Sequence, residues 1–80
     1  MKEEIKTLLE NALPLVNPES DFLFAELDSL GVATILLMLS EKYGIKLDHT
    51  DATPRNLKNI EALAALVERK LAEKAAGKER

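Results

Sequence analysis

The chain has 80 residues, 46% of them hydrophobic, which allows one small domain with a single core and leaves hardly any room for an enclosed active site. It contains no cysteine, which excludes disulfides and thiolate metal sites, and its single histidine makes no metal site by itself. The net charge of −3 and the lack of a basic stripe argue against nucleic acid as a partner.

The amino-terminal stretch "MKEEIKTLLE" has acids where a secretory signal has a basic start and a long apolar run. No run of apolar residues approaches the length that spans a membrane. We therefore expect a soluble cytoplasmic protein that does not insert into membranes, and the absence of cysteine is compatible with a reducing compartment.

Hydrophobic residues at helical spacing predict a first amphipathic helix over residues 2–13, which Pro14 ends. Residues 14–28 follow as a loop with two prolines, no sustained period and several apolar side chains. Structureless loops of this length in small domains are usually functional or partly tied down, and we expect the same here.

A central helix is predicted from Ser29 to Tyr43. Asp28 offers a carboxylate that can cap its first turn, and Gly44 supplies the left-handed stop that ends it. These two residues therefore define both ends of the helix from local chemistry alone.

The second half of the chain predicts a short helical turn at residues 55–57, which Pro54 begins, and a final helix capped by Asn59. The tail at residues 73–80 is expected to fray. The predicted fold is all-α: a small bundle of three main helices plus one short helix, in a single domain over residues 1–80 with an ordered core at roughly 2–73.

The central helix carries more apolar residues than one core needs. A complete core stripe is formed by Val32, Ile35, Leu36, Leu39 and Tyr43. A second set is left over: Leu30, Ala33, Leu37 and Met38. Because so small a bundle cannot surround one helix on all sides, part of this second stripe should face solvent and serve as a docking surface for proteins. The alternative is that loop residues such as Phe22 and Leu23 cover it.

Ser29 can be interpreted in several ways. Serine is common in the first turn of a helix, so Asp28 and Ser29 can be an ordinary cap. A nucleophile is disfavoured because His49 lies in a polar connector and no base with an orienting partner is evident. A helix amino terminus also presents unpaired N–H groups and the positive end of the helix dipole, so a phosphate attached to Ser29 would be stabilised there.

The motif "LDSL" at residues 27–30 resembles the phosphopantetheine attachment motif of acyl and peptidyl carrier proteins. The resemblance covers roughly residues 5–71: a first helix, a long loop, the Asp-Ser-Leu start of the second helix, "EKYGIKL" at its end, a short third helix and a closing helix. The order of the elements around the motif makes the resemblance specific.

The resemblance implies that Ser29 receives 4′-phosphopantetheine from coenzyme A, that Asp28 helps a phosphopantetheinyl transferase to recognise the site, and that Leu30 contacts the arm. In this family the thiol of the arm holds a cargo as a thioester, and the protein passes it between enzymes. The implied function is therefore a carrier, not an enzyme, and the implied partners are the transferase and ligases or synthases that load acyl or aminoacyl groups.

Two differences from many fatty-acid carriers lie near the motif. Glu26 stands where those carriers have glycine, and the central helix has only Glu41 as an acid between Ser29 and Tyr43. Docking should therefore depend on apolar contacts more than on charge. The predicted docking residues are Leu30, Ala33, Thr34, Leu37 and Glu41.

We interpret the chain as a free-standing, monomeric carrier in a specialised biosynthetic pathway. Its candidate cargos are a short or modified acyl group, an aminoacyl group and a polyketide unit, and a short polar cargo would leave the arm in solvent. The alternative function is an unmodified helical protein-interaction domain in which Ser29 only caps the helix.

Overall fold

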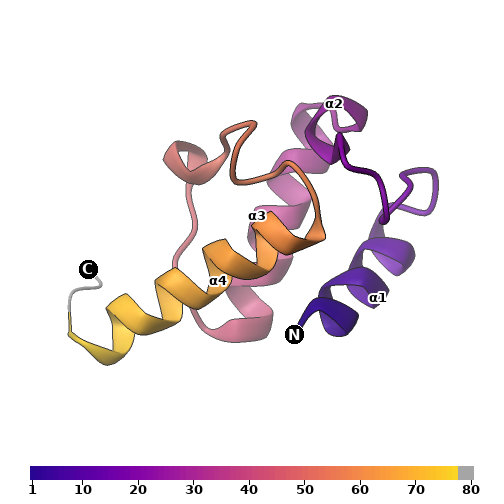
Figure 1. Cartoon of the computed structure of the whole chain (residues 1–80). Coiled ribbons are helices and arrows are strands. Elements are labelled where there is room, and N and C mark those ends of the chain that lie inside the picture. Colours follow the sequence, from indigo (N-terminus) through magenta and orange to yellow (C-terminus); the bar gives the residue numbers. More distant parts are fainter. Residues whose placement is uncertain (78–80) are drawn as a thin grey trace.

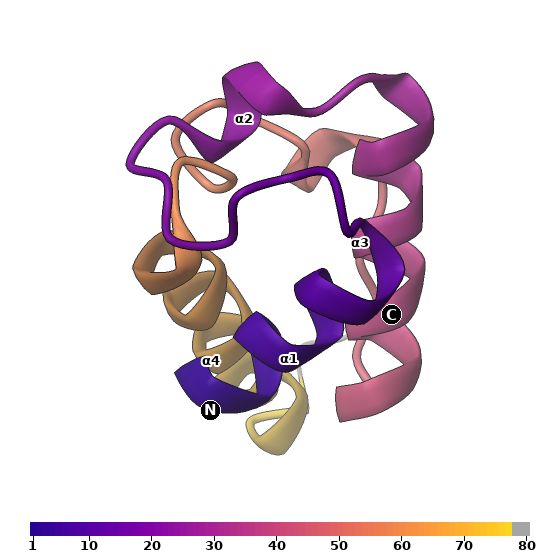
Figure 2. The same ribbon diagram turned by 90° about the vertical axis from the view of Figure 1, so that its right-hand side faces the viewer.

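Three long helices form the framework of the molecule, whose computed structural model describes residues 1–77 (Figure 1). They are α1 (Lys2–Ala12), α3 (Ser29–Tyr43) and α4 (Ile60–Ala75). α1 packs against both α3 and α4, and α3 also contacts α4 (Figure 2). The described residues contain no strand, and the predicted all-α class is confirmed.

The ends of α3 and α4 lie where their capping residues predict them. The Asp28 carboxylate accepts a hydrogen bond of 2.7 Å from the amide of Gly31, and Gly44 ends α3 with a φ of 62°. The Asn59 side chain accepts from the amide of Ala62 at 2.8 Å and begins α4. Each bond satisfies an amide in the first turn that no helical carbonyl can reach.

The core between the three helices is aliphatic. Its fully buried side chains are Ile5, Leu9, Leu23, Ile35, Leu39, Leu57, Leu63, Leu66 and Val67. The set draws on every long helix and on both connecting segments, so the loops are part of the core. At about 25 cal/mol per Å² of apolar surface, burial of such residues is the main favourable contribution to folding.

Two short helices lie in the connecting segments, and neither was predicted at its observed place. α2 (Leu23–Glu26) interrupts the expected loop, because Leu23 is fully buried and its amide donates to the carbonyl of Lys58 at 2.7 Å. The helical turn predicted at residues 55–57 is present as turns over residues 54–57, closed by a hydrogen bond of 3.0 Å from the Leu57 amide to the Thr53 carbonyl. A 3₁₀ helix that was not predicted, η1 (His49–Asp51), lies before it. A reciprocal capping box across η1 explains its position.

α4 is longer than predicted. It continues to Ala75, past the expected end of the ordered core at residue 73 and into the tail expected to fray. The end of that tail, residues 78–80, lies outside the described residues. Within residues 1–77, no helix combines the length and the apolar character that crossing a membrane requires.

Candidate functional site

The start of α3 presents Ser29 to solvent. Asp28 is extended and precedes the helix as its N-cap, which makes Ser29 the first helical residue. The Ser29 side chain is exposed, whereas Gly31 behind it is buried. The chain therefore turns into the helix in such a way that the serine hydroxyl is accessible beside a carboxylate.

Gly31 allows the cap to pack tightly. A Cβ atom at this position would lie 3.2 Å from Asp28 Oδ1, closer than Cβ contacts normally are, and 3.4 Å from Leu27 Cδ2, an ordinary contact distance. A glycine in the first turn therefore gives the Asp28 carboxylate room to approach the backbone. The signal for this contact is present in the sequence, since a glycine inside a helix usually has a packing reason.

The same turn suits a phosphate group. The Gly31 amide is taken by Asp28, while the amides of Ser29 and Leu30 lie in the first turn, where the helix offers no acceptor. These amides and the positive end of the helix dipole favour an anion next to the serine. The residues present therefore fit a phosphodiester attached to the Ser29 hydroxyl.

Ser29 differs from the other serines of the chain. Ser20 accepts a hydrogen bond from the amide of Phe22 at 3.0 Å, and Ser40 donates to the carbonyl of Leu36 at 2.7 Å; both are half-buried. The exposed Ser29 hydroxyl forms no hydrogen bond within residues 1–77. Of these hydroxyl groups, that of Ser29 is best placed to react with an incoming group.

The two apolar stripes of α3 have different environments, as predicted. Ile35 and Leu39 are fully buried, whereas Leu30 is 75% exposed and Leu37 is 60% exposed. Ala33 is also exposed, and Met38 is half-buried. The alternative in which loop residues cover the second stripe does not hold for this structure, because Phe22 is 73% exposed and Leu23 points into the core.

The other two predicted docking residues border this stripe. Thr34 is half-buried, and its hydroxyl donates to the carbonyl of Leu30 at 2.8 Å. Glu41 is exposed one turn beyond Leu37. The structure therefore brings together all five predicted docking residues on the solvent side of α3.

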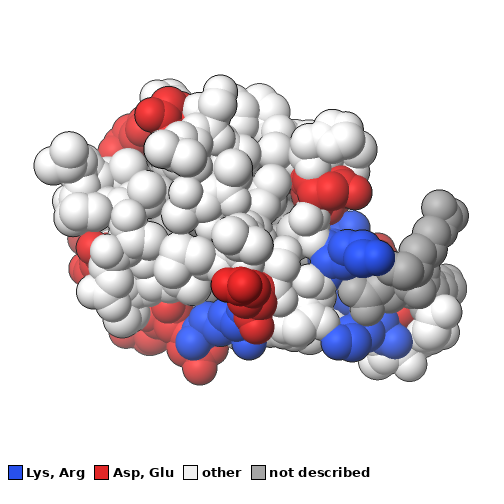
Figure 3. All heavy atoms as spheres, turned by 180° about the vertical axis from the view of Figure 1, so that it is seen from behind, with Lys and Arg blue, Asp and Glu red and all other residues white. Residues whose placement is uncertain are grey.

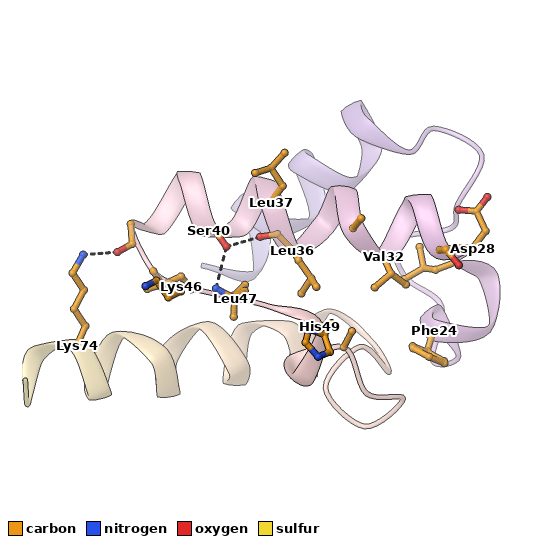
Figure 4. A pocket seen from close by; sticks show the side chains of 16 residues that line it. Phe24, Asp28, Val32, Leu36, Leu37, Ser40, Lys46, Leu47, His49 and Lys74 are labelled. Atoms are coloured by element: carbon orange, nitrogen blue, oxygen red, sulfur yellow. Dashed lines mark hydrogen bonds between the residues drawn. The ribbon is translucent and has the colours of Figure 1, made fainter. Parts of the chain in front are cut away.

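A groove of about 1010 Å³ begins at Asp28 and Ser29 and follows α3 to its other end (Figure 4). It lies between α3 and the connector that follows Gly44, and Phe24 of α2 and Lys74 of α4 also line it. Its lining residues are Phe24, Leu27, Asp28, Ser29, Val32, Ala33, Leu36, Leu37, Ser40, Gly44, Ile45, Lys46, Leu47, His49, Ala52 and Lys74. The sequence did not predict this groove, since one of its walls comes from the connector at residues 44–52, which is distant from the motif.

Ser40 fastens the connector to α3 along this groove. Its hydroxyl donates to the carbonyl of Leu36 and accepts from the amide of Leu47 at 3.3 Å (Figure 4). At the far end, the Lys74 ammonium donates to the carbonyl of Gly44, which ties α4 to the end of α3. Both contacts hold the walls of the groove in place.

Glu26, which stands two residues before Asp28, ties the long loop to the motif. Its carboxylate accepts a hydrogen bond of 3.0 Å from the amide of Asn17. This bond, together with one from the Ser20 hydroxyl, lowers the pKa of Glu26 below its usual 4.5. The glutamate therefore stabilises the loop next to Ser29, a role that a glycine could not have.

The structure of residues 1–77 shows neither a base bonded to Ser29 nor a group of metal ligands. His49 is exposed on η1 and lines the groove, and it has no hydrogen bond to Ser29. Within this part of the chain no three His, Cys, Asp or Glu side chains are grouped so as to hold a metal ion.

The model of the family described as phosphopantetheine attachment site matches residues 1–67. The match includes α1, α2, α3 and η1 and the first half of α4, and so contains the whole start of α3. No curated protein and no solved structure matches the chain.

Proposed function

The chain belongs to the family of domains with a phosphopantetheine attachment site, and we propose that Ser29 is the attachment residue of a carrier for acyl or aminoacyl groups. The observation that supports it is the exposed, unbonded Ser29 hydroxyl on the first turn of a capped helix, at the mouth of a groove. Domains of this family carry groups and do not catalyse reactions.

In the proposed attachment, Ser29 Oγ forms a bond to the β-phosphorus of coenzyme A while the pyrophosphate bond breaks. Adenosine 3′,5′-bisphosphate leaves, and the hydroxyl proton passes to a base on the transferase. Asp28 keeps the first turn closed and offers the transferase a carboxylate beside the serine. Leu30, on the next position, gives the arm an apolar contact. The bound group supplies a thiol that holds the cargo as a thioester.

The exposed stripe of α3 is the proposed docking surface for partner enzymes: Leu30, Ala33, Thr34, Leu37 and Glu41. Seen from behind, on the side of α3, much of the surface is uncharged (Figure 3). Apolar contact area with few charges favours binding that depends little on ionic strength. We expect partners of this kind: a phosphopantetheinyl transferase, and ligases or synthases that load and receive the cargo.

The salt dependence of loading tests this surface. Leu37→Ala should weaken loading by a partner enzyme, and raising the ionic strength from 50 to 500 mM should change it little. Lys58→Gln, on the connector away from α3, is the matched control and should load normally. A partner whose rate falls steeply with salt and is unaffected by Leu37→Ala would refute an apolar docking surface on α3.

Intact mass measurement tests the attachment itself. Incubation with coenzyme A and a transferase of broad specificity should add one phosphopantetheine to the wild-type chain and none to Ser29→Ala. Ser20→Ala is the control and should be modified as the wild type is. No mass gain, or a gain that persists in Ser29→Ala, would refute the proposal and favour an unmodified interaction domain in which Ser29 only caps α3.

We place this carrier in the cytoplasm as a monomer that serves a specialised pathway. The single acid on α3 between Ser29 and Tyr43 is the feature that supports a specialised role, because basic partner surfaces find little to bind there.

A further inference from the structure

Few polar side chains line the groove along α3. Apart from Ser29 they are Asp28, Ser40, Lys46, His49 and Lys74. The side chains of Asp28 and Ser40 are bonded to backbone amides, and the Lys74 ammonium is bonded to a backbone carbonyl. Lys46 also has a partner. The ring of His49, in contrast, forms no hydrogen bond within residues 1–77.

The backbone that carries His49 is tied down on two sides. His49 is the first residue of η1, and the reciprocal capping box of Asp48 and Asp51 closes this turn. Asp51 Oδ1 also forms an ion pair of 3.2 Å with Lys70 on α4, and the Asp51 carbonyl accepts a hydrogen bond of 3.0 Å from the Asn56 side chain. The His49 ring is therefore presented to the groove from an anchored segment, with both ring nitrogens available for a ligand.

The His49 ring lies opposite the second turn of α3. Figure 4 shows it across the groove from Val32 and Leu36. At 1.5 Å per residue, these two residues follow Ser29 by about 5 and 10 Å along the helix axis. In phosphopantetheine the first amide is about five bonds from the phosphorus, or roughly 6 Å at about 1.2 Å per extended bond. An arm that runs from Ser29 along the groove would bring this amide level with His49.

An amide in this position needs a hydrogen-bond partner. The side chains of Val32, Leu36 and Leu47 around it are apolar and offer none, and an amide that loses water without a new partner is destabilised. A neutral imidazole has one donor and one acceptor, so it can pair with either the carbonyl or the N–H of an amide. We propose that His49 binds the arm through the amide nearer to the phosphate and so keeps the arm along the groove. This inference rests on the proposed attachment at Ser29.

NMR spectroscopy of the arm tests the contact. A transferase attaches the arm from coenzyme A labelled with ¹⁵N in both pantetheine amides, and intact mass verifies the product. The proton signal of the first amide should differ from that in free pantetheine, and it should show a nuclear Overhauser effect to the His49 ring. In His49→Ala the ratio of docked to free arm should fall about two- to tenfold, as expected for the loss of one hydrogen bond. Because His49 is exposed, this variant should fold normally, which the amide spectrum of the unmodified chain verifies.

Two further variants separate a hydrogen bond from a packing effect. His49→Gln keeps a donor and an acceptor and should retain most of the shift, and Lys58→Gln, whose side chain does not line the groove, should retain all of it. An arm in the wild type with the amide signals of free pantetheine would overturn the proposal, as would a shift that persists in His49→Ala or one that is lost equally in His49→Gln. If no arm is attached, the attachment at Ser29 is refuted and the contact with it; if an arm is attached but not shifted, only the contact is refuted.

Discussion

The division of α3 into a buried and an exposed stripe makes a quantitative prediction for two leucines on one helix. Leu39 is fully buried and Leu37 is 60% exposed. Truncation of a buried leucine to alanine costs about 2–5 kcal/mol. Full burial of a leucine stabilises by about 1.5–3 kcal/mol, so the 40% of Leu37 that is covered contributes roughly 1 kcal/mol at most. The higher helix propensity of alanine offsets part of that loss.

Urea denaturation measures both values. With a slope of about 1 kcal/mol per molar urea, Leu39→Ala should lower the midpoint by about 2 M or more, and Leu37→Ala by less than 1 M. A domain of this size has about 4–12 kcal/mol of stability in total, so Leu39→Ala can leave little folded protein. In that case Ile35→Val, which should cost about 0.5–1.5 kcal/mol, replaces it as the buried reference. Equal costs at positions 37 and 39 would show that the second stripe is buried, and the docking surface would be refuted.

Three further predictions concern the cap, the tyrosine and the loop. Asp28→Ala should lower the stability by about 1 kcal/mol and slow phosphopantetheine transfer. Asp28→Asn keeps a hydrogen-bond acceptor, so it should slow transfer at little cost in stability. Unchanged stability and transfer in Asp28→Ala would refute the roles of Asp28 as a cap and as a recognition residue. Burial and the 2.8 Å bond to Glu4 raise the pKa of Tyr43 to about 12. The stability that the Tyr43 hydroxyl contributes is therefore complete below its ordinary pKa of 10.0 and is lost as the pH rises toward 12. Ultraviolet titration should show that Tyr43 ionises at a high pH, and that it ionises at a lower pH in Glu4→Gln. Because the pKa of Glu26 is lowered, the stability that its carboxylate contributes is present above pH 4.5 and is lost as the pH falls below that value. The melting temperatures of wild type and Glu26→Gln should therefore converge as the pH falls below 4.5. A difference that stays constant would contradict the contact with Asn17.

Local signals in the sequence were sufficient to predict the frame of the site. Asp28 and Gly44 define α3, and Asn59 begins α4, because each acts on backbone groups within a few residues of itself. The exposed stripe followed from counting apolar residues against the size of the bundle. The position of Ser29 on the first turn was correct for the same local reason.

Contacts between residues distant in the chain determine the features that the sequence did not predict. α2 depends on the bond from the Leu23 amide to Lys58, and the groove depends on Ser40 holding Leu47. No pattern in a single segment reports such pairs. The turn at residues 54–57, in contrast, could be predicted from Pro54, which suits the start of a helical turn.

The geometry of α3 explains how one helix can contribute to the core, to the proposed docking surface and to the groove. Successive residues turn by about 100° around the axis, which places the buried side chains of Ile35 and Leu39 on one side and the exposed Leu30 and Leu37 on the other. Figure 4 shows the side chains of Leu36 and Leu37 leaving the helix in different directions. Ser29 falls between these two sides, on the strip that also bears Leu36 and Ser40, and this strip is the wall of the groove.

An arm on Ser29 would therefore start between the core and the docking surface, with the groove directly in line. A partner that contacts Leu30 and Leu37 would sit beside the cargo without having to displace any core side chain. The same arrangement explains why Ser40 is a better residue than an acid at its position: its hydroxyl closes the groove onto the Leu47 amide, whereas a carboxylate has no proton to donate to the Leu36 carbonyl. A serine at position 40 thus both keeps α3 less charged and holds the connector that forms the groove.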